Sequence, residues 1–572
     1  MKPETEHSRT PIHRIILPMI MAIAMGWPSQ GRLEAAPPDP APCLEAFYEV
    51  RSWLDADDFP KVEAETSVLQ IPDATAIGVL LRLDGRVVGR GLDTTPDGRA
   101  VRRAAGRALA QAFGDRVIRA LPRDIRASAG SRLSLEIEFA GAAEPIVASS
   151  LGTAATRIRP GIDGIVMKRG DLTAIAMPGR LLATGTADAT GSTLLRLVDQ
   201  LGLPPRDLEE LRRIDSIELG RFETIRIGQD APSAEPRIRI RSGGVVPPGP
   251  VDRSLIEEIG SRLTERLLRW RPPAAPTDDD AQLVPERPWF GDFDPIADRH
   301  VPFEATDRDR LLAIWALATS APGSITATDL APPDAESIDP EIADLGLLAA
   351  LALGDPDRIE SWLAIARAHP ATDEPVSLAR RAAALAGIPE PLLSDEEAVA
   401  AHGAAWVGCD SASDVISGFD WLALAEARLS RRRGEPTDRV VSLRAIRDAL
   451  LARQLDGEGD DAGGIPLRAG TLRTVDARSL RPMFAISVLE GIPGEEESGA
   501  ARANRGLAGL VRLLRQLMMS PEEAADLPGG SRGQGGVAVG LADPRQSLAA
   551  TATASLILDQ LSRTVESRKD DP

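Results

Sequence analysis

The sequence predicts a multidomain protein with an α+β front half and an all-α rear half. At 572 residues the chain is too long for a single hydrophobic core. Short apolar segments that alternate with glycine turns and amphipathic helix patterns fill the first 242 residues. From Thr306 onward nearly every periodic signal is helical. A helical array or a closed α/α toroid is therefore expected in the rear half.

The N-terminus has the form of a signal peptide. Basic residues precede the apolar run Ile15–Trp27, which is too short to span a bilayer comfortably. Small residues follow, and cleavage is expected near Gly31 or Ala35. We therefore assign residues 1–36 to a signal peptide and expect an exported protein, periplasmic or secreted, with no further transmembrane segment. An uncleaved signal anchor is the alternative.

The front domain is assigned to residues 43–242, and its first part shows a helix, a hairpin and a second helix. Leu44–Leu54 is amphipathic. Gly78–Leu83 is apolar and ends at Asp84-Gly85, a dipeptide typical of hairpin turns. Apolar residues recur at helical spacing over Arg99–Phe113.

The rest of the front domain alternates strands and one helix. Leu133–Phe139 alternates apolar and polar residues, which predicts a half-buried strand. Ile165–Met177 reads as a second hairpin, and Ser192–Leu203 as a helix that stops before proline. Arg237–Arg241 alternates arginine with isoleucine, as an edge strand does. Its three arginines either bind an anion or prevent edge-to-edge pairing.

Residues 243–304 are assigned to a Gly/Pro-rich linker that contains one helix, about Arg253–Leu268. Residues 305–566 form the predicted helical domain. Its helices begin at recognisable caps, such as Thr306 with Asp309 and Ser394 with Glu397. Further helices are expected at Pro340–Leu353, Pro356–Ala368, Asp420–Arg433, Arg439–Gln454, Arg481–Leu489, Ala501–Met519 and Gln546–Ser562.

The segment PGIDGIVMKRGDLTAIAMPGRLLATG, followed by a helix and DSIELGRF, resembles the AMMECR-type domain family. The resemblance covers about Ile77–Ile227 and implies an α+β scaffold, from a family without a firmly established activity. The family's Leu-Arg-Gly-Cys-Ile-Gly motif is replaced here by Val87–Leu92, in which only Gly89 matches. Gly89, Arg90 and Gly91 are the candidate ligand-binding residues of this region. A tight turn or bulge is the alternative role for the two glycines.

The rear half resembles α/α-toroid proteins of the terpene-cyclase and prenyltransferase kind, chiefly in its tail from Gly535 to Leu561. A cyclase needs an acidic protonation motif and aromatic walls, whereas aromatic residues make up only 3% of this chain. The resemblance therefore implies a toroid that binds rather than cyclises. Four tryptophans are candidates to line a shared concavity, with packing in the helix core as the alternative: Trp315, Trp362, Trp406 and Trp421.

Charge and composition narrow the function class. The net charge of −19 argues against nucleic-acid binding. The region from Ile77 to Ser242 is mildly basic and the remainder is acidic, which indicates either attraction between the domains or two separate solvated surfaces.

No metal site and no cofactor are predicted, because the histidines lack the spacing of ligands. Cys43 and Cys409 lie in different predicted domains, and the sequence leaves their pairing open. We expect an exported envelope protein that binds or scaffolds a protein or small-molecule ligand without catalysis. The alternative is a carbohydrate-active or other enzyme with its site in the helical domain.

Overall fold

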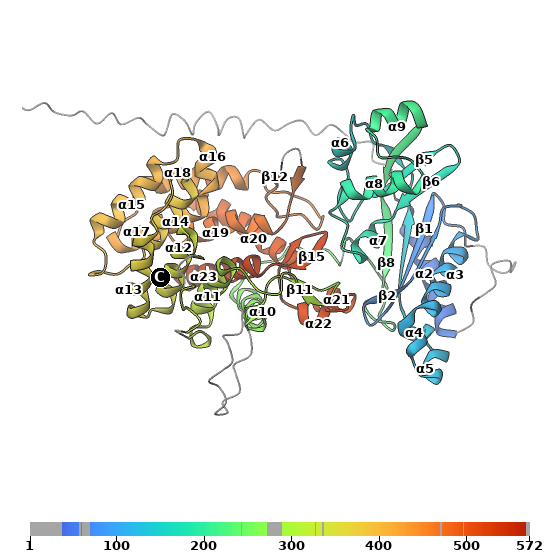
Figure 1. Cartoon of the computed structure of the whole chain (residues 1–572), viewed down its shortest axis with the longest axis horizontal. Helices are drawn as coiled ribbons and strands as arrows, with labels where there is room; N and C mark the ends of the chain where they lie inside the picture. Colours follow the sequence, from blue (N-terminus) through green and yellow to red (C-terminus); the bar gives the residue numbers. More distant parts are fainter. Residues whose placement is uncertain are drawn as a thin grey trace, which may run out of the picture.

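The computed structural model describes residues 37–567 except 57–58, 60–68, 242, 272–288, 327, 334–336, 470–471 and 496. The predicted signal peptide lies outside the described residues. Two bodies lie side by side along the long axis of the molecule (Figure 1). We call residues 37–241 the front domain and residues 253–567 the helical domain. The multidomain organisation, with an α+β front and a mainly helical rear, agrees with the sequence prediction.

A five-stranded antiparallel sheet of order β2-β1-β3-β8-β9 is the centre of the front domain. Its strands are β1 (Ala76–Leu83), β2 (Arg86–Asp93), β3 (Ser134–Ala140), β8 (Thr224–Gly228) and β9 (Arg237–Ile238). Helices α2 (Pro40–Ala56) and α3 (Ala100–Gly114) cover one face and bury Phe47 and Val101 against Leu135 and Ile137. The short helices α4 (Arg116–Ala120) and α5 (Arg123–Ala127) follow α3.

The hairpin of β1 and β2 forms as predicted. Asp84 and Gly85 both have positive φ, at 48° and 76°, which is the conformation that an Asp-Gly turn supplies. The register of the two strands shifts between Leu81 and Arg82, and Val88 is the extra residue of the resulting bulge in β2. β9 is the edge strand of the sheet, as the alternating arginines indicate.

Strand β3 differs from its prediction, because all seven of its residues are buried rather than half of them. Ile137 and its apolar neighbours face α2 and α3, while Glu136 and Glu138 face the opposite way. That second face is covered by α7 (Pro178–Ala183), where the amide of Gly179 donates to Glu138 Oε1 at 2.7 Å. The polar residues of this alternating pattern therefore form a buried charged layer instead of a solvent-exposed face.

A second antiparallel sheet of order β4-β7-β5-β6 stacks beside the first. Its strands are β4 (Glu144–Pro145), β5 (Gly164–Arg169), β6 (Leu172–Ala176) and β7 (Ile217–Phe222). The helices α6 (Leu151–Ala155), α8 (Thr190–Gln200) and α9 (Leu208–Asp215) close its core. Phe222 and Met177 pack against Ala76 and Ala140 of the first sheet in a small apolar cluster.

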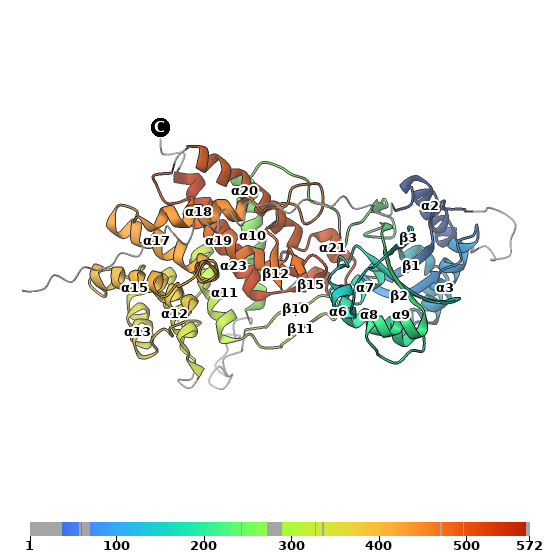
Figure 2. The ribbon, with the colours of Figure 1, turned by 90° about the horizontal axis from the view of Figure 1, so that it is seen from above.

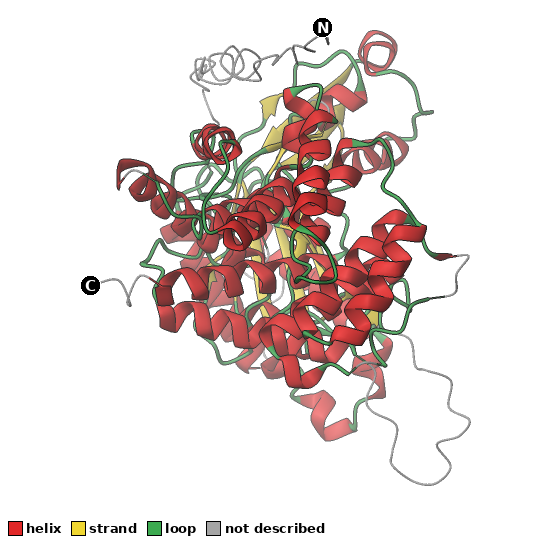
Figure 3. Cartoon of the chain, turned by 90° about the vertical axis from the view of Figure 1, so that its left-hand side faces the viewer, coloured by secondary structure: helices red, strands yellow, loops and turns green. Residues whose placement is uncertain are grey.

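Among the described helices of the rear domain, six contact one another in a closed succession, which we call the helix ring. Its members in order are α11 (Asp307–Ser320), α12 (Pro340–Leu353), α14 (Pro375–Leu385), α17 (Phe419–Arg433), α19 (Leu480–Leu489) and α23 (Leu548–Ser567). Viewed from this end of the molecule, helices fill the foreground (Figure 3). Asp339 and Asp355 cap the helices that Pro340 and Pro356 open, and both helices have the bounds that the sequence predicts.

Further helices pack outside the ring. They are α10 (Arg253–Trp270), α13 (Pro356–Ala368), α15 (Asp395–Val407), α16 (Ala412–Ser417), α18 (Arg439–Leu451) and α20 (Glu497–Leu517). Helix α10 falls in the stretch that the sequence assigns to a linker, and it buries Leu263, Leu267 and Trp270 in the helical core against α23. None of the helices in the described residues has both the length and the apolar character needed to cross a bilayer.

The helical domain also contains two small antiparallel sheets that the sequence did not predict. One has the order β11-β10-β15-β14 and the other pairs β12 with β13. Their strands are β10 (Phe293–Asp294), β11 (Arg299–His300), β12 (Leu467–Ala469), β13 (Leu472–Thr474), β14 (Ala538–Gly540) and β15 (Asp543–Gln546). They form in glycine- and proline-containing segments that cannot continue a helix.

The two domains meet at α21 (Pro521–Ala525) and β15, next to β2 and α7 (Figure 2). Arg239 forms an ion pair with Asp526 across this contact, and Arg82 Nη1 donates to the carbonyl of Asp526 at 3.0 Å. Arg241 forms an ion pair with Asp460 nearby. The strand predicted over Arg237–Arg241 is only two residues long, and Arg239 and Arg241 follow it. These two arginines bind carboxylates of the helical domain, whereas Arg237 pairs with Asp230 of the front domain.

Candidate functional site

Two cavities lie at opposite ends of the helix ring. The first, about 820 Å³, is lined by C-terminal residues of α11, α12, α17 and α23, and we call it the arginine cavity. The second, about 580 Å³, is lined by N-terminal residues of the same helices, and we call it the tryptophan cavity. Trp315 and Leu556 line both cavities and form the wall between them. Both volumes are in the range of small-molecule sites.

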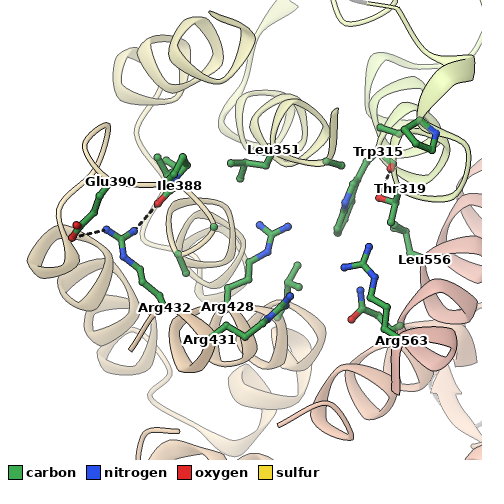
Figure 4. Close-up of a pocket in the computed structure, with 18 of the residues that line it drawn as sticks. Trp315, Thr319, Leu351, Ile388, Glu390, Arg428, Arg431, Arg432, Leu556 and Arg563 are labelled. Carbon is green, nitrogen blue, oxygen red and sulfur yellow. Dashed lines mark hydrogen bonds and ion pairs between the residues drawn. The ribbon is translucent and has the colours of Figure 1, made fainter. Parts of the chain in front are cut away.

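Four arginines line the arginine cavity: Arg428, Arg431, Arg432 and Arg563. The first three lie three and four residues apart on α17, so helical periodicity places them on one side of the helix. Figure 4 shows the side chains of Arg428, Arg431 and Arg563 reaching from α17 and α23 around a common space, while Arg432 extends away from it.

Arg428 and Arg431 have carbonyl partners only. Arg428 Nη1 donates to the carbonyl of Ala383 at 2.9 Å, and Arg431 Nε donates to the carbonyl of Ala427 at 3.2 Å. Among the described residues neither guanidinium forms an ion pair with a carboxylate. Because a guanidinium has five N–H donors, each contact fixes the group and leaves most donors directed elsewhere.

The other two arginines have acidic partners. Arg432 is held by Asp395 and by Glu390, whose Oε1 lies 3.8 Å from Nη2, and it also donates to two backbone carbonyls. Arg563 pairs with Asp559 one turn earlier on α23, with 2.9 Å between Nη2 and Oδ2. The carboxylates on the cavity lining are therefore bonded to Arg432 and not to Arg428 or Arg431.

Burial and the closeness of the positive charges lower the pKa of two of these arginines. Burial, together with the charges of Arg431 and Arg563, lowers the pKa of Arg428 to about 9. Burial and the charge of Arg563 also lower the pKa of Arg431. Three positive groups are thus held within mutual repulsion range, at a free-energy cost that an anion would relieve.

A glycine and an apolar wall complete the cavity. A Cβ atom at Gly387 would lie 2.8 Å from Arg428 Nη1. Because glycine has no side chain, the guanidinium can occupy this space. Trp315, Leu351 and Leu556 also line the cavity (Figure 4). Cations and apolar surface in one cavity suit an organic anion.

The tryptophan cavity has mostly satisfied charges. Asp420 binds Arg481, Glu341 binds Arg308 and Arg380, and Asp476 binds Arg478. Asp292 is the fourth carboxylate on the lining; burial raises its pKa, and its Oδ1 accepts the amide of Leu548 at 2.9 Å, which caps α23.

The four candidate tryptophans separate into two pairs. Trp315 and Trp421 stack with ring centroids 6.2 Å apart on the wall of the tryptophan cavity. Trp362 is fully buried, and its Nε1 donates to the carbonyl of Leu330 at 3.1 Å. Trp406 is buried beside His402, to which its Nε1 donates at 3.1 Å. The structure brings Trp315 and Trp421 together, and it places Trp362 and Trp406 in the helical core.

Gly89 and Gly91 of β2 lie against α3, where a Cβ atom would come within 2.3 Å of the Ala108 carbonyl oxygen and 1.8 Å of the Ala104 carbonyl oxygen. They therefore allow close strand–helix packing. Arg90 points to the opposite face of the sheet, where burial and the charges of Arg180 and Arg82 lower its pKa.

The cavity arginines are not among the residues that the sequence predicts as ligand-binding, because arginine is abundant throughout the chain. The signal was the dense cluster EARLSRRRG at the end of a predicted helix, with arginines at helical spacing. Arg563 comes from the last helix and carries no signal of its own.

The described residues contain no group of three or more potential metal ligands. Cys43 is buried in the front domain and Cys409 is partly buried in the helical domain, and both are free thiols. Burial raises the pKa of Cys409 to about 11, so this thiol is protonated at neutral pH.

Comparison with known proteins identifies no family. No family model matches the sequence, and no curated protein matches it. Among solved structures, the chain is similar to an uncharacterized protein from Pyrococcus horikoshii, at 16% identity over 34% of this chain and 93% of that protein. The TM-score is 0.25, which does not establish a shared fold.

Proposed function

We propose that this chain is a non-catalytic binding protein whose helical domain takes a small organic anion into the arginine cavity. The observation that carries the proposal is the pair Arg428 and Arg431, which line a cavity of about 820 Å³ without a carboxylate partner among the described residues. Arg428 is half-buried and Arg431 is exposed. A half-buried cation is ordinarily paired, so Arg428 beside this cavity indicates that a ligand supplies the missing charge.

The partial negative charge at helix C-termini accounts for some of the arginine at this end of the ring. Arg432 illustrates that role, because it donates to the carbonyls of Ile388 and Leu393 and also binds two carboxylates. Arg428 and Arg431 each bind one carbonyl, which leaves donors for a ligand. The helix ends therefore hold these groups in place without neutralising them.

The test is a thermal-shift panel of anionic, neutral and cationic organic compounds of matched size. At about 100 times its dissociation constant, a ligand adds roughly 2.7 kcal/mol to stability. We expect shifts from anions only, and their loss in Arg428→Gln and Arg431→Gln. Arg433→Gln is the matched control, because Arg433 lies on the same helix, pairs with Glu435 and is absent from the cavity lining. Shifts that persist unchanged in both cavity variants would contradict the proposal.

An enzyme in the helical domain is the second candidate, and the tryptophan cavity is its place. Paired carboxylates are what glycoside hydrolysis requires. Three of the four carboxylates there are bound to arginines, and Asp292 accepts a helix amide. This arrangement favours binding over catalysis. Turnover of any glycan by the wild type, abolished in Asp292→Asn and retained in Arg428→Gln, would reverse that preference.

The proposal includes export to the cell envelope, supported by the basic and then apolar pattern of residues 1–36. It also includes a divergent AMMECR-like scaffold in front and an α/α toroid behind, the latter supported by the closed succession of the helix ring. Fractionation of a C-terminally tagged chain tests export. A soluble form in the cytoplasm that retains Met1 would contradict it.

A further inference from the structure

We infer that the occupant of the arginine cavity is an amphiphilic phosphomonoester, with its dianionic head among Arg428, Arg431 and Arg563 and an apolar body against Trp315, Leu351 and Leu556. This inference rests on the proposed function and names the class of ligand for that site.

The net positive charge of the arginine cavity indicates the charge that the head group of the ligand carries. Three guanidinium groups surround the common space, and one of them, Arg563, shares its charge with Asp559. About two positive charges are left without a carboxylate. A monocarboxylate would neutralise one of them and leave the other beside its neighbours, whereas a phosphomonoester carries about −1.5 to −2 charges at neutral pH.

The shape of the donor set leads to the same class. The guanidinium groups come from two helices, and a head placed among them is approached from more than one side. A carboxylate has two oxygens in one plane, which suits a single bidentate arginine. A phosphate has three terminal oxygens arranged around phosphorus, so that three arginines can each donate to a different oxygen.

The apolar wall requires that the ligand be more than inorganic phosphate. The Trp315 ring stands across the cavity from Arg428 and on the same side as Arg563 (Figure 4), and Leu351 and Leu556 also line the cavity. Phosphate alone would leave this surface in contact with water. A chain of several carbons would cover it, at about 0.8 kcal/mol for each CH₂ group removed from water.

Isothermal titration calorimetry of the mature chain with hexyl phosphate, hexyl sulfate, hexanoate and inorganic phosphate tests the inference. We expect hexyl phosphate to bind at least tenfold more tightly than each of the other three at pH 7.5. Arg428→Gln and Arg431→Gln should each weaken hexyl phosphate at least tenfold, and Arg433→Gln should change it less than twofold. Gly387→Ala, which displaces the Arg428 guanidinium without removing its charge, should weaken it severalfold.

The pH dependence separates the dianion from the monoanions. The second ionisation of a phosphomonoester lies near pH 6, so its affinity should rise between pH 5 and 7.5, while that of hexyl sulfate stays constant. The charged groups facing the head are the three arginines, Arg432 with Glu390 and Asp395, and Asp559. These protein groups act equally on both ligands, so the ratio of the two affinities isolates the charge of the phosphate.

The outcomes distinguish this inference from the proposed function. If hexyl sulfate or hexanoate binds as tightly as hexyl phosphate and depends on Arg428, the dianionic head is wrong and anion binding stands. If inorganic phosphate binds as tightly as hexyl phosphate, the apolar body is wrong. If no anion binds, or if Arg428→Gln and Arg431→Gln change nothing, both proposals fall.

Discussion

Two groups of arginines in this molecule show opposite balances of charge. At the domain contact, Arg82, Arg226 and Arg239 surround Glu136, and Arg239 also binds Asp526 and Asp230; we call these six residues the junction cluster. In the arginine cavity three guanidinium groups share a single carboxylate, Asp559. The junction cluster neutralises itself, whereas the cavity needs an external anion.

The comparison shows how structural and binding arginines differ where residue type does not separate them. Burial raises the pKa of Glu136, but the charges of Arg226, Arg82 and Arg239 outweigh it, and the net pKa is lowered. The carboxylate is therefore ionised and holds its neighbours together. In the cavity, burial lowers the pKa of Arg428, and its charged neighbours Arg431 and Arg563 lower it further instead of opposing burial. The sign of the neighbours decides the role.

The largest effect should come from breaking the junction cluster. Arg239→Met leaves Asp526 without its ion-pair partner in a buried site and removes one of the three cations around Glu136, which typically costs about 3–5 kcal/mol. Urea unfolding of the full chain measures the loss. Arg237→Met is the control, because Arg237 lies two residues before Arg239 and has a half-exposed side chain, and it should cost less than about 1 kcal/mol. Equal losses in the two variants would show that the cluster does not stabilise the contact.

Glu138 sharpens the comparison, since it is buried beside the junction cluster and is incompletely neutralised. Burial, opposed by Arg226 and reinforced by Glu136, raises the pKa of Glu138 to about 7. A carboxyl group with a raised folded-state pKa stabilises the fold fully below its unfolded pKa, and that stabilisation is lost as pH rises through 7. Glu138→Gln should match the wild type at pH 4.5 and exceed its stability at pH 8 by on the order of 2 kcal/mol.

Denaturation at the two pH values measures this difference. Glu218→Gln, on an exposed position of β7, should leave the pH dependence unchanged. A wild-type stability that does not fall between pH 4.5 and 8 relative to Glu138→Gln would show that Glu138 is ionised throughout. In that case the junction cluster would neutralise Glu138 as completely as it neutralises Glu136.

Local patterns were sufficient to predict much of the fold. The Asp84-Gly85 turn predicted the first hairpin, and the Asp355-Pro356 pair predicted the start of α13. The second face of β3 could not be predicted in this way. Its burial depends on α7 and on the distant helical domain, and alternation alone is the same for a solvated and a buried charged face.

The candidate site was less predictable than the fold, because a sequence shows charges and not their partners. Arg428 and Arg432 lie on one helix four residues apart, and only the structure shows that Arg432 meets Asp395 and Glu390 while Arg428 meets none. Trp315 was predicted as a ligand-contacting residue, and it lies on both cavities. Trp362 had the same sequence signal and lies in the core, since residue type does not determine which side of a helix faces a cavity.

The smallest change in folding stability should come from a substitution in the unliganded arginine cavity. It should be a gain, whereas the substitution at the junction cluster causes a loss. The folded-state pKa of Arg428, about 9, lies below that of the unfolded chain, so the folded state carries a cost of charge at pH 7 that disappears as pH rises above 9. Arg428→Gln should therefore stabilise the free protein by about 0.5–1 kcal/mol at pH 7 and by less at pH 10.5. Thermal unfolding at both pH values, with Arg433→Gln as the unchanged control, measures this. A substitution that raises stability while it abolishes anion binding would show that Arg428 is retained for the ligand and not for the fold, whereas a loss like that of Arg239→Met would place it with the junction arginines.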